Sequence, residues 1–308
     1  MIKKNKIQIL ISSCFVFVAC SKMVKTDGIT YGRDLTPIHY KVLGKGSPLL
    51  IINGGPGMNC NGFEKLAEQL SENNLTILYD QRGTGQSVLK IMDTTTVTIQ
   101  LMIDDIEQLR KHLKIDKWSI LGHSFGGMLA SQYATQYPQH IEKLVLSSSG
   151  GIDLSLLTYV GKAINSKLNP IQLDSVNYWT QKIEAGDTSH TARLNRGRNL
   201  APAYVLNKKY LPIIAERLTQ GNGTINQLIW QDFQKIEFNC AEKLKTFNRP
   251  VLIIQGKEDI ISAETAEREH AVFSNSKVVL MDHCIHYGWL DNPEVYFKEI
   301  SQFLRSEK

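Results

Sequence analysis

The segment Gly122-His123-Ser124-Phe125-Gly126 places a serine in a G-x-S-x-G motif. A serine hydroxyl is a weak nucleophile unless it is exposed, oriented and paired with a base. An apolar run at 118–121 precedes the motif, and a helix-compatible segment at 128–137 follows it. Strand, sharp turn and helix is the setting in which such a motif exposes its serine, and its glycines allow the backbones to approach closely. The pattern predicts that Ser124 is an acyl-transfer nucleophile.

A serine nucleophile also needs a base that takes its proton and a carboxylate that orients the base. The apolar run 251–254 leads into Glu258 and Asp259, so either carboxylate could stand on the turn that leaves a strand. Three histidines follow in the chain: His270, His283 and His286. The first falls in an amphipathic segment, and the other two share the loop after 277–281. Spacing alone does not choose between these two histidines.

The elements that must position these residues alternate along the chain. Short apolar runs predict strands at 48–52, 75–79, 118–121, 144–146, 251–254 and 277–281. Helix-like segments lie at 63–72, 99–113, 128–137, 263–273 and 293–304. Uninterrupted apolar runs are typical of strands that are buried on both faces. The alternation predicts an α/β fold with a doubly wound, mostly parallel sheet, in which sites form at the carboxyl ends of the strands.

This alternation stops between about residues 151 and 246, where the sequence is polar, aromatic and helix-like. A buried strand resumes directly afterwards at 251. We therefore expect residues 21–150 and 247–308 to form the core and residues 151–246 to form a helical cap inserted over the edge of the sheet. The alternative is an independent second domain.

The composition of the chain argues against a nucleic-acid partner, a bound metal and a disulfide framework. The net charge of +5 over 308 residues is spread out, and no Lys/Arg tract interleaves with aromatic residues, so we expect no nucleic-acid partner. No C-x-x-C or H-E-x-x-H pattern is present, and we expect neither a metal nor another cofactor. Without Cys14 and Cys20, three cysteines remain, which argues against a disulfide framework: Cys60, Cys240 and Cys284.

The first twenty residues have a different character. Lys3, Lys4 and Lys6 precede an apolar stretch at 7–19 that is too short to span a bilayer as a helix. The stretch ends in Ala19-Cys20-Ser21, which resembles a bacterial lipoprotein signal. The resemblance implies that residues 1–20 contain a signal peptide, that Cys20 carries a lipid, and that the protein is exported and anchored to a bacterial membrane. The alternatives are an ordinary secretory signal, with release to the periplasm, or an uncleaved anchor.

Two further motifs carry a family resemblance. Asn53-Gly54-Gly55-Pro56-Gly57 resembles the His-Gly-Gly-Pro-Gly loop of the prolyl aminopeptidase (proline iminopeptidase) group of α/β-hydrolases. The segment 80–87, Asp-Gln-Arg-Gly-Thr-Gly-Gln-Ser, resembles the D-Q-R-G-x-G-x-S motif of the same group. Together with the serine motif, the resemblance covers about residues 38–304. It implies an α/β-hydrolase fold with the chain order serine, acid, histidine.

The resemblance also assigns the remaining site residues. The Gly-x-x-Asp spacing from Gly256 favours Asp259 as the acid, and the pattern that ends in Pro293-Glu294 favours His286 as the base. The backbone N–H groups of Gly55 and Phe125 would form the oxyanion hole. We expect Asp80 and Arg82 to brace loops rather than to react.

The activity implied by the resemblance is that of a serine aminopeptidase, which releases N-terminal proline or another small residue from peptides through an acyl-enzyme. Such an enzyme must recognise a free amine, and the cap offers four carboxylates that could do so: Glu184, Asp187, Asp232 and Glu237. The cap also has a cationic cluster at Arg193, Arg196 and Arg198. A carboxylesterase or amidase acting on a small acyl substrate is the first alternative, and a non-catalytic binding protein is the second.

Overall fold

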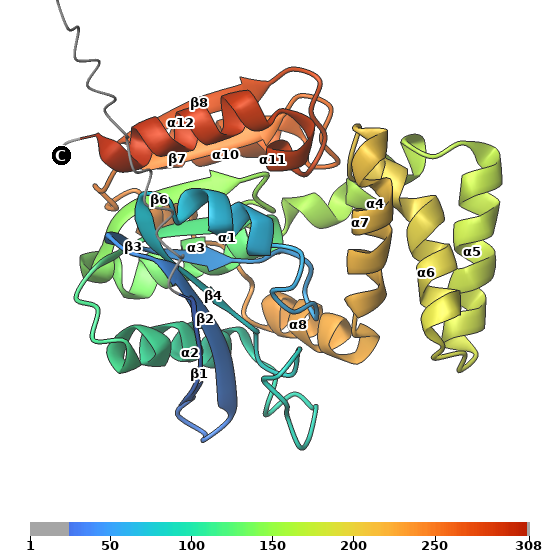
Figure 1. The fold of residues 1–308 in the computed structure, drawn as a ribbon, viewed down its shortest axis with the longest axis horizontal. Helices are drawn as coiled ribbons and strands as arrows, with labels where there is room; N and C mark the ends of the chain where they lie inside the picture. Colours follow the sequence, from blue (N-terminus) through green and yellow to red (C-terminus); the bar gives the residue numbers. More distant parts are fainter. Residues whose placement is uncertain (1–24, 307–308) are drawn as a thin grey trace, which may run out of the picture.

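The computed structural model describes residues 25–306 and contains one eight-stranded sheet (Figure 1). Its strands are β1 (Lys25–Tyr31), β2 (Pro37–Gly44), β3 (Ser47–Ile52), β4 (Asn74–Tyr79), β5 (Trp118–His123), β6 (Ile141–Ser147), β7 (Val251–Gly256) and β8 (Ser276–Met281). They lie in the order β1-β2-β4-β3-β5-β6-β7-β8. β2 is antiparallel to both of its neighbours, and the six strands from β4 to β8 are parallel. The predicted fold class is confirmed.

The central strand β3 shows why the apolar runs could be recognised as strands. Leu50 and Ile52 belong to the hydrophobic cluster on one face of the sheet, whereas Leu49 and Ile51 belong to the cluster on the other. All four side chains are fully buried. Because both faces are covered, the strand needs apolar residues at every position rather than at alternate ones.

Helices pack against both faces of the sheet. The face toward Leu49 packs against α1 (Glu64–Leu70), α11 (Gly288–Asp291) and α12 (Pro293–Arg305). The face toward Leu50 packs against α2 (Ile99–His112), α3 (Phe125–Gln136) and α10 (Ala263–Val272). Short 3₁₀ helices lie at Pro138–His140, Ser155–Thr158, Ala201–Ala203, Lys208–Tyr210 and Leu218–Gln220. The five predicted helical segments all correspond to helices, with ends that differ by at most three residues.

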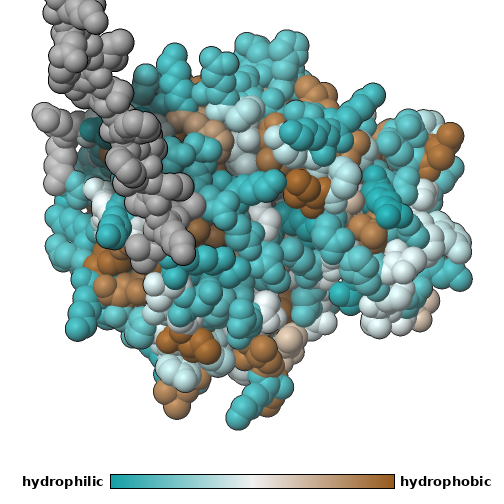
Figure 2. Space-filling model, in the orientation of Figure 1, coloured by the Kyte–Doolittle hydropathy of each residue, from teal (hydrophilic) through white to brown (hydrophobic). Residues whose placement is uncertain are grey.

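The hairpin of β1 and β2 is absent from the strands expected from sequence. β1 is one of the two edge strands of the sheet, and six of its seven residues are not buried. An edge strand that faces solvent needs no continuous apolar run, so its sequence, KTDGITY, carries little of the signal that marks β3. The surface seen in Figure 2 is likewise mostly hydrophilic, with small scattered apolar patches.

Residues 151–246, which we call the cap, lie between β6 and β7 in the chain. They contain the helices α4 (Val160–Ser166), α5 (Pro170–Glu184), α6 (His190–Leu200), α7 (Leu211–Arg217), α8 (Gly223–Lys235) and α9 (Ala241–Leu244). α6 packs between α5 and α7, at the right of Figure 1, and α8 packs against α2. β6 and β7 pair directly, with Leu146 opposite Ile253, so the chain returns from the cap to the neighbouring strand. The division into a core and an inserted helical cap stays a prediction.

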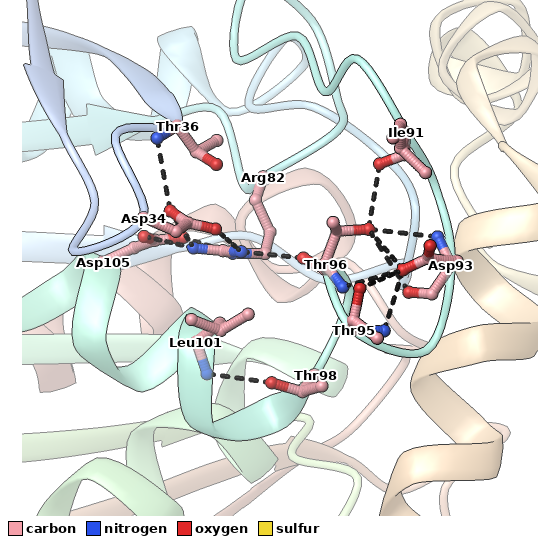
Figure 3. Close-up of polar contacts among 10 residues, drawn as sticks. All are labelled: Asp34, Thr36, Arg82, Ile91, Asp93, Thr95, Thr96, Thr98, Leu101 and Asp105. Atoms are coloured by element: carbon pink, nitrogen blue, oxygen red, sulfur yellow. Dashed lines mark hydrogen bonds and ion pairs between the residues drawn. The ribbon is translucent and has the colours of Figure 1, made fainter.

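Arg82 braces the loop that follows β4, as expected (Figure 3). Its side chain is fully buried and donates two hydrogen bonds of 2.7 Å to the carboxylate of Asp105. It also donates to Asp34 Oδ2 at 3.0 Å and to the carbonyl of Thr96 at 2.7 Å. Burial raises the pKa of Asp105 to about 6 although Arg82 opposes the shift. The ion pairs therefore tie the loop to α2 and to the β1–β2 hairpin.

The signal peptide and the lipid site at Cys20 lie outside the described residues. Within residues 25–306, no helix has both the length and the apolar character that crossing a membrane requires.

Candidate active site

Ser124 stands on the turn between β5 and α3, in the strand–turn–helix setting that its motif predicts. Its φ of +56° is unusual for a residue other than glycine. A Cβ on Gly122 would lie 2.4 Å from the carbonyl oxygen of Gly126, and one on Gly126 would lie 2.1 Å from that of Ile52. Only glycines fit here, and they let the turn present Ser124, which is partly exposed between buried neighbours.

Asp259 and His286 meet at the same edge of the sheet. The Nδ1 atom of His286 lies 2.8 Å from Asp259 Oδ1, and the two side chains are 4% and 0% exposed. Asp259 stands on the turn after β7, and His286 lies in the loop after β8. A carboxylate that accepts the Nδ1 proton leaves Nε2 of a neutral imidazole as a proton acceptor.

The competing candidates lie elsewhere. His283 is exposed, and His270 is exposed on α10 with its Nδ1 at 2.8 Å from the Ser276 hydroxyl. Glu258 is exposed and accepts a hydrogen bond from the backbone N–H of Cys284. Of the acids and histidines that spacing left open, the structure therefore pairs only Asp259 with His286.

The cap holds the backbone around His286. The N–H of His286 donates to the carbonyl of Tyr204 at 3.2 Å. Asp291 accepts from the N–H of Ile285 at 2.9 Å with one carboxylate oxygen, and its other oxygen accepts from two backbone N–H groups of the cap, those of Leu206 and Asn207. Burial raises the pKa of Asp291, and these three hydrogen bonds oppose the shift. The orientation of His286 therefore depends on contacts with the cap.

His123, next to the nucleophile, packs its ring behind His286. The two ring centroids are 4.7 Å apart, and His123 is 1% exposed. Burial, together with the electrostatic effects of the neighbouring His286 and Arg217, holds the pKa of His123 well below its usual range. His123 is therefore neutral at neutral pH and forms an uncharged wall behind the predicted base.

The predicted oxyanion-hole donors flank the nucleophile. A Cβ on Gly54 would lie 2.8 Å from the Cβ of Ser124, which shows how closely the loop after β3 approaches. Among the described residues, no backbone carbonyl accepts the N–H of Gly55 or of Phe125. Phe125 is the first residue of α3, so its N–H lies at the positive end of the helix dipole. Both groups are thus available to a developing negative charge.

One cavity of about 270 Å³ brings the predicted site residues together. Ser124, His286, Gly55 and Phe125 all line it. Most of the remaining wall is apolar, and the cap and core share it: Met58, Met128, Val160, Ile164, Leu218 and Trp230. Tyr204, Tyr287 and Asn226 contribute uncharged polar groups. Of the described residues, no Asp, Glu, Lys or Arg lines this cavity.

The cap carboxylates considered for amine recognition are placed away from this cavity. Glu184 and Asp187 are not buried, and Asp232 accepts a hydrogen bond of 2.7 Å from the N–H of Ile99. Asp232 and Glu237 line a separate surface pocket of about 490 Å³ that contains none of the predicted site residues. The cationic cluster does not reach the cavity either: Arg193, Arg196 and Arg198.

The other reactive side chains form no second centre that we can identify within the described residues. Cys60, Cys240 and Cys284 are buried free thiols. In residues 25–306, no three His, Cys, Asp or Glu side chains are grouped as metal ligands.

Comparison with known proteins identifies the architecture. Residues 47–293, most of the chain, match the family described as alpha/beta hydrolase fold. The chain belongs to the α/β-hydrolase fold family. This α/β-hydrolase is 28% identical over 272 residues to the proline iminopeptidase of Heyndrickxia coagulans, covering 85% of this chain and 92% of the relative. It is 28% identical over 278 residues to that of Saccharolobus solfataricus, covering 86% and 87%. The resemblance to the prolyl aminopeptidase group is confirmed, and the protein is a hydrolase.

Solved structures of α/β-hydrolases share the fold. An α/β-fold hydrolase from Bacillus anthracis str. Sterne aligns with a TM-score of 0.74 and 18% identity, covering 92% of this chain and all of that chain. An esterase from Exiguobacterium antarcticum has a TM-score of 0.70 at 20% identity, with 91% and 100% covered. Proline iminopeptidase from Mycobacterium smegmatis has a TM-score of 0.66 at 20% identity, with 91% and 97% covered.

Two residues of this α/β-hydrolase site were not found from sequence. Asn226 lines the cavity, and Arg217 binds the loop that carries Gly55. Both belong to the cap and lie far in sequence from every motif. No spacing rule connects them to the strand ends, so only the docking of the cap reveals them.

Proposed function

We propose that this protein is a serine hydrolase that cleaves an ester or amide bond through an acyl-enzyme. The observation that carries the proposal is the 2.8 Å contact of Asp259 with His286, which lines the same cavity as Ser124. This arrangement supports Ser124 as nucleophile, His286 as general base and Asp259 as the group that orients the imidazole and stabilises its charged form.

In acylation, Ser124 Oγ forms a bond to the substrate carbonyl carbon while His286 takes the hydroxyl proton. The carbonyl oxygen becomes an oxyanion, and the N–H groups of Gly55 and Phe125 stabilise it. Collapse of the tetrahedral intermediate breaks the bond to the leaving group, which departs with the proton from His286. Water then attacks the acyl-enzyme by the same route, releasing the acid and restoring Ser124. Each oxyanion donor contributes about 3 kcal/mol of transition-state stabilisation in comparable sites.

The cavity best fits a small acyl group that is apolar and uncharged. Its volume of about 270 Å³ limits the size of the acyl group, and aliphatic, aromatic and thioether side chains form most of its wall. Burying a substrate ammonium group without a counter-charge would cost free energy, and no carboxylate of the described residues lines this cavity. These features favour an ester or a neutral amide as substrate.

An aminopeptidase is the second candidate, because the proline iminopeptidases are relatives along most of the chain. In that case uncharged acceptors would have to bind the substrate amine. Asn226 is placed for this role: its Nδ2 donates to the carbonyl of Pro56 at 3.2 Å, which leaves its side-chain oxygen as an acceptor at the cavity wall.

A matched substrate panel separates the two classes. p-Nitrophenyl acetate and butyrate should be hydrolysed, and N-acetylprolyl-naphthylamide should react at least as well as free prolyl-naphthylamide if the acyl group must be uncharged. An amine-requiring enzyme would instead hydrolyse prolyl- or alanyl-naphthylamide and lose that activity on N-acetylation. Activity on neither class, with a correctly folded protein, would contradict the hydrolase proposal itself.

The proposed location is a bacterial membrane, through a lipid on Cys20, and it rests on the sequence at the N-terminus alone. The mass of the mature N-terminal peptide tests it. A diacylated or triacylated Cys20 is expected, and an unmodified N-terminus would exclude the anchor.

A further inference from the structure

Arg217, the last residue of α7, is a buried cation beside the predicted oxyanion hole. It is 2% exposed. Its Nη2 donates to the carbonyl oxygen of Gly54 at 3.0 Å, and its Nε lies 3.3 Å from the hydroxyl of Tyr287. Its Nη1 donates to the carbonyls of Asn59 and Asn61. A single cap side chain therefore holds both ends of the loop that follows β3.

Unlike most buried arginines, Arg217 has no acidic partner within ion-pair distance among the described residues. Its charge is met by carbonyl dipoles, by a tyrosine hydroxyl and by the ring of Phe63, whose centroid lies 4.6 Å from the guanidinium carbon. A buried charge without a counter-charge costs free energy. Its positive field reaches the site, because it contributes to the lowered pKa of His123.

The carbonyl that Arg217 binds belongs to the same peptide group as the Gly55 N–H. In a planar trans peptide, the C=O of Gly54 and the N–H of Gly55 point in opposite directions. Fixing the carbonyl therefore fixes the direction of the N–H. The side chain of Asn53 donates to the same carbonyl oxygen at 3.1 Å, so the side chains of Arg217 and Asn53 together fix its position.

We infer that Arg217 is a positioning residue of the oxyanion hole, which orients and polarises the Gly54–Gly55 peptide so that the Gly55 N–H is aimed at the substrate oxyanion. A charged donor on the carbonyl withdraws electron density from the peptide and strengthens the hydrogen bond that its N–H can give. The positive charge of Arg217, which no carboxylate balances, also favours the transition state. Negative charge develops on the carbonyl oxygen of the substrate only in that state.

The inference rests on the proposed serine-hydrolase function and adds a role for the cap. The donors of the oxyanion hole are backbone groups of the core, whereas Arg217 comes from α7. The hole is therefore correctly formed only when the cap is seated on the loop after β3. The cap takes part in catalysis as well as in forming the cavity wall.

The test compares Arg217→Met with Arg110→Met, using p-nitrophenyl butyrate or whichever panel substrate the wild type turns over. Arg110 is a matched control because it is 7% exposed and bonds to Glu107 and to backbone carbonyls, but lies on α2 outside the cavity. Thermal unfolding and circular dichroism establish that each variant is folded. Each kcat is calculated per active site, and the active sites are counted as the amount of Ser124 that a fluorophosphonate labels when the reaction is complete.

We expect Arg217→Met to lower kcat roughly 10- to 100-fold with little change in KM, since an aligned oxyanion donor acts in the transition state. The inhibition constant of n-butylboronic acid, whose serine adduct is tetrahedral and anionic, should rise by a similar factor. Arg217→Lys keeps the positive charge and one donor atom, so its kcat and its boronate inhibition constant should lie between those of the wild type and those of Arg217→Met. Arg110→Met should lose stability but keep kcat per labelled site.

Unchanged kcat and boronate inhibition in Arg217→Met would overturn the inference, and so would a rise in KM alone. If Arg217→Met does not fold, Arg217→Lys is measured in the same way, and wild-type values for that variant would also overturn it. Failure of the proposed function looks different, because the wild type would then show neither labelling at Ser124 nor hydrolysis of any panel substrate.

Discussion

The core and the cap contribute different things to the site. The predicted catalytic groups all stand where parallel core strands end: Gly55 after β3, Ser124 after β5, Asp259 after β7 and His286 after β8. The cap adds apolar walls such as Val160 and Trp230, and backbone contacts to the histidine loop. The predicted catalytic groups therefore come from the core, whereas the cap contributes part of the cavity wall and the contacts that position two of the loops carrying those groups.

Two buried arginines show the same contrast. Arg82, in the core, is neutralised by the carboxylates of Asp105 and Asp34. Arg217, in the cap, meets only carbonyls, a hydroxyl and an aromatic ring among the described residues. A paired cation is suited to holding loops together. An unpaired cation beside the predicted oxyanion hole would instead help to stabilise the oxyanion in the proposed mechanism.

The largest effect is expected where the core pairs acid and base. Asp259→Asn should lower kcat roughly 10³- to 10⁴-fold, because an amide cannot hold the imidazole in the required tautomer or stabilise its charged form. Glu258→Gln is the matched control and should retain near wild-type kcat, since Glu258 is exposed and binds a backbone N–H. Steady-state kinetics on the best panel substrate measures both. A greater loss in Glu258→Gln would reassign the acid.

Arg82→Met tests whether the core arginine is purely structural. Removing it leaves Asp105 buried without its partner, which should reduce the free energy of unfolding by about 3 kcal/mol. Urea denaturation measures the loss, and kcat per labelled Ser124 should stay within a few-fold of wild type. A variant with wild-type stability and greatly reduced kcat would erase the distinction between Arg82 and Arg217.

The core also contains a buried carboxyl group that titrates near neutral pH. Burial raises the pKa of Glu269 on α10 from 4.5 to about 8. The folded protein therefore keeps a proton that the unfolded chain loses above pH 4.5, so the stability falls as the pH rises to about 8 and then levels off. Glu269→Gln should add on the order of 3 kcal/mol at pH 9 and little at pH 4. Unfolding at the two pH values measures this, and an equal change at both would contradict it.

The smallest effect concerns the cap wall. Val160→Phe, at the start of α4, should fill part of the cavity and lower kcat/KM for p-nitrophenyl butyrate about tenfold, with little loss for the acetate. Ile171→Phe is the control, because Ile171 is 80% exposed on α5 and does not line the cavity. Equal losses on both esters would mean that the cap does not select by acyl size.

Sequence predicts the core well because its signals are local. A strand buried on both faces, such as β3, must be apolar throughout, and a serine turn as tight as that at Ser124 must have glycines on both sides. The edge strand β1 lacks such a signal because solvent covers it.

The contacts of the cap depend on docking across long stretches of sequence. Arg217 reaches Gly54 over 163 positions, and Asp232 binds α2 at Ile99 instead of facing a substrate amine. Charge and spacing within the cap could not show either contact. The choice between His283 and His286 also depends on the folded structure, since both lie in one loop but only His286 is buried and contacts Asp259.

The site of covalent labelling tests most directly whether Ser124 is the nucleophile. The protein is treated with a fluorophosphonate, digested and mapped by mass spectrometry, and Ser124→Ala is assayed in parallel. We expect a single adduct on the peptide that contains Ser124 and loss of hydrolysis as labelling completes, with neither labelling nor activity in Ser124→Ala. An adduct on another residue, or a Ser124→Ala protein that still hydrolyses the substrate, would contradict this expectation.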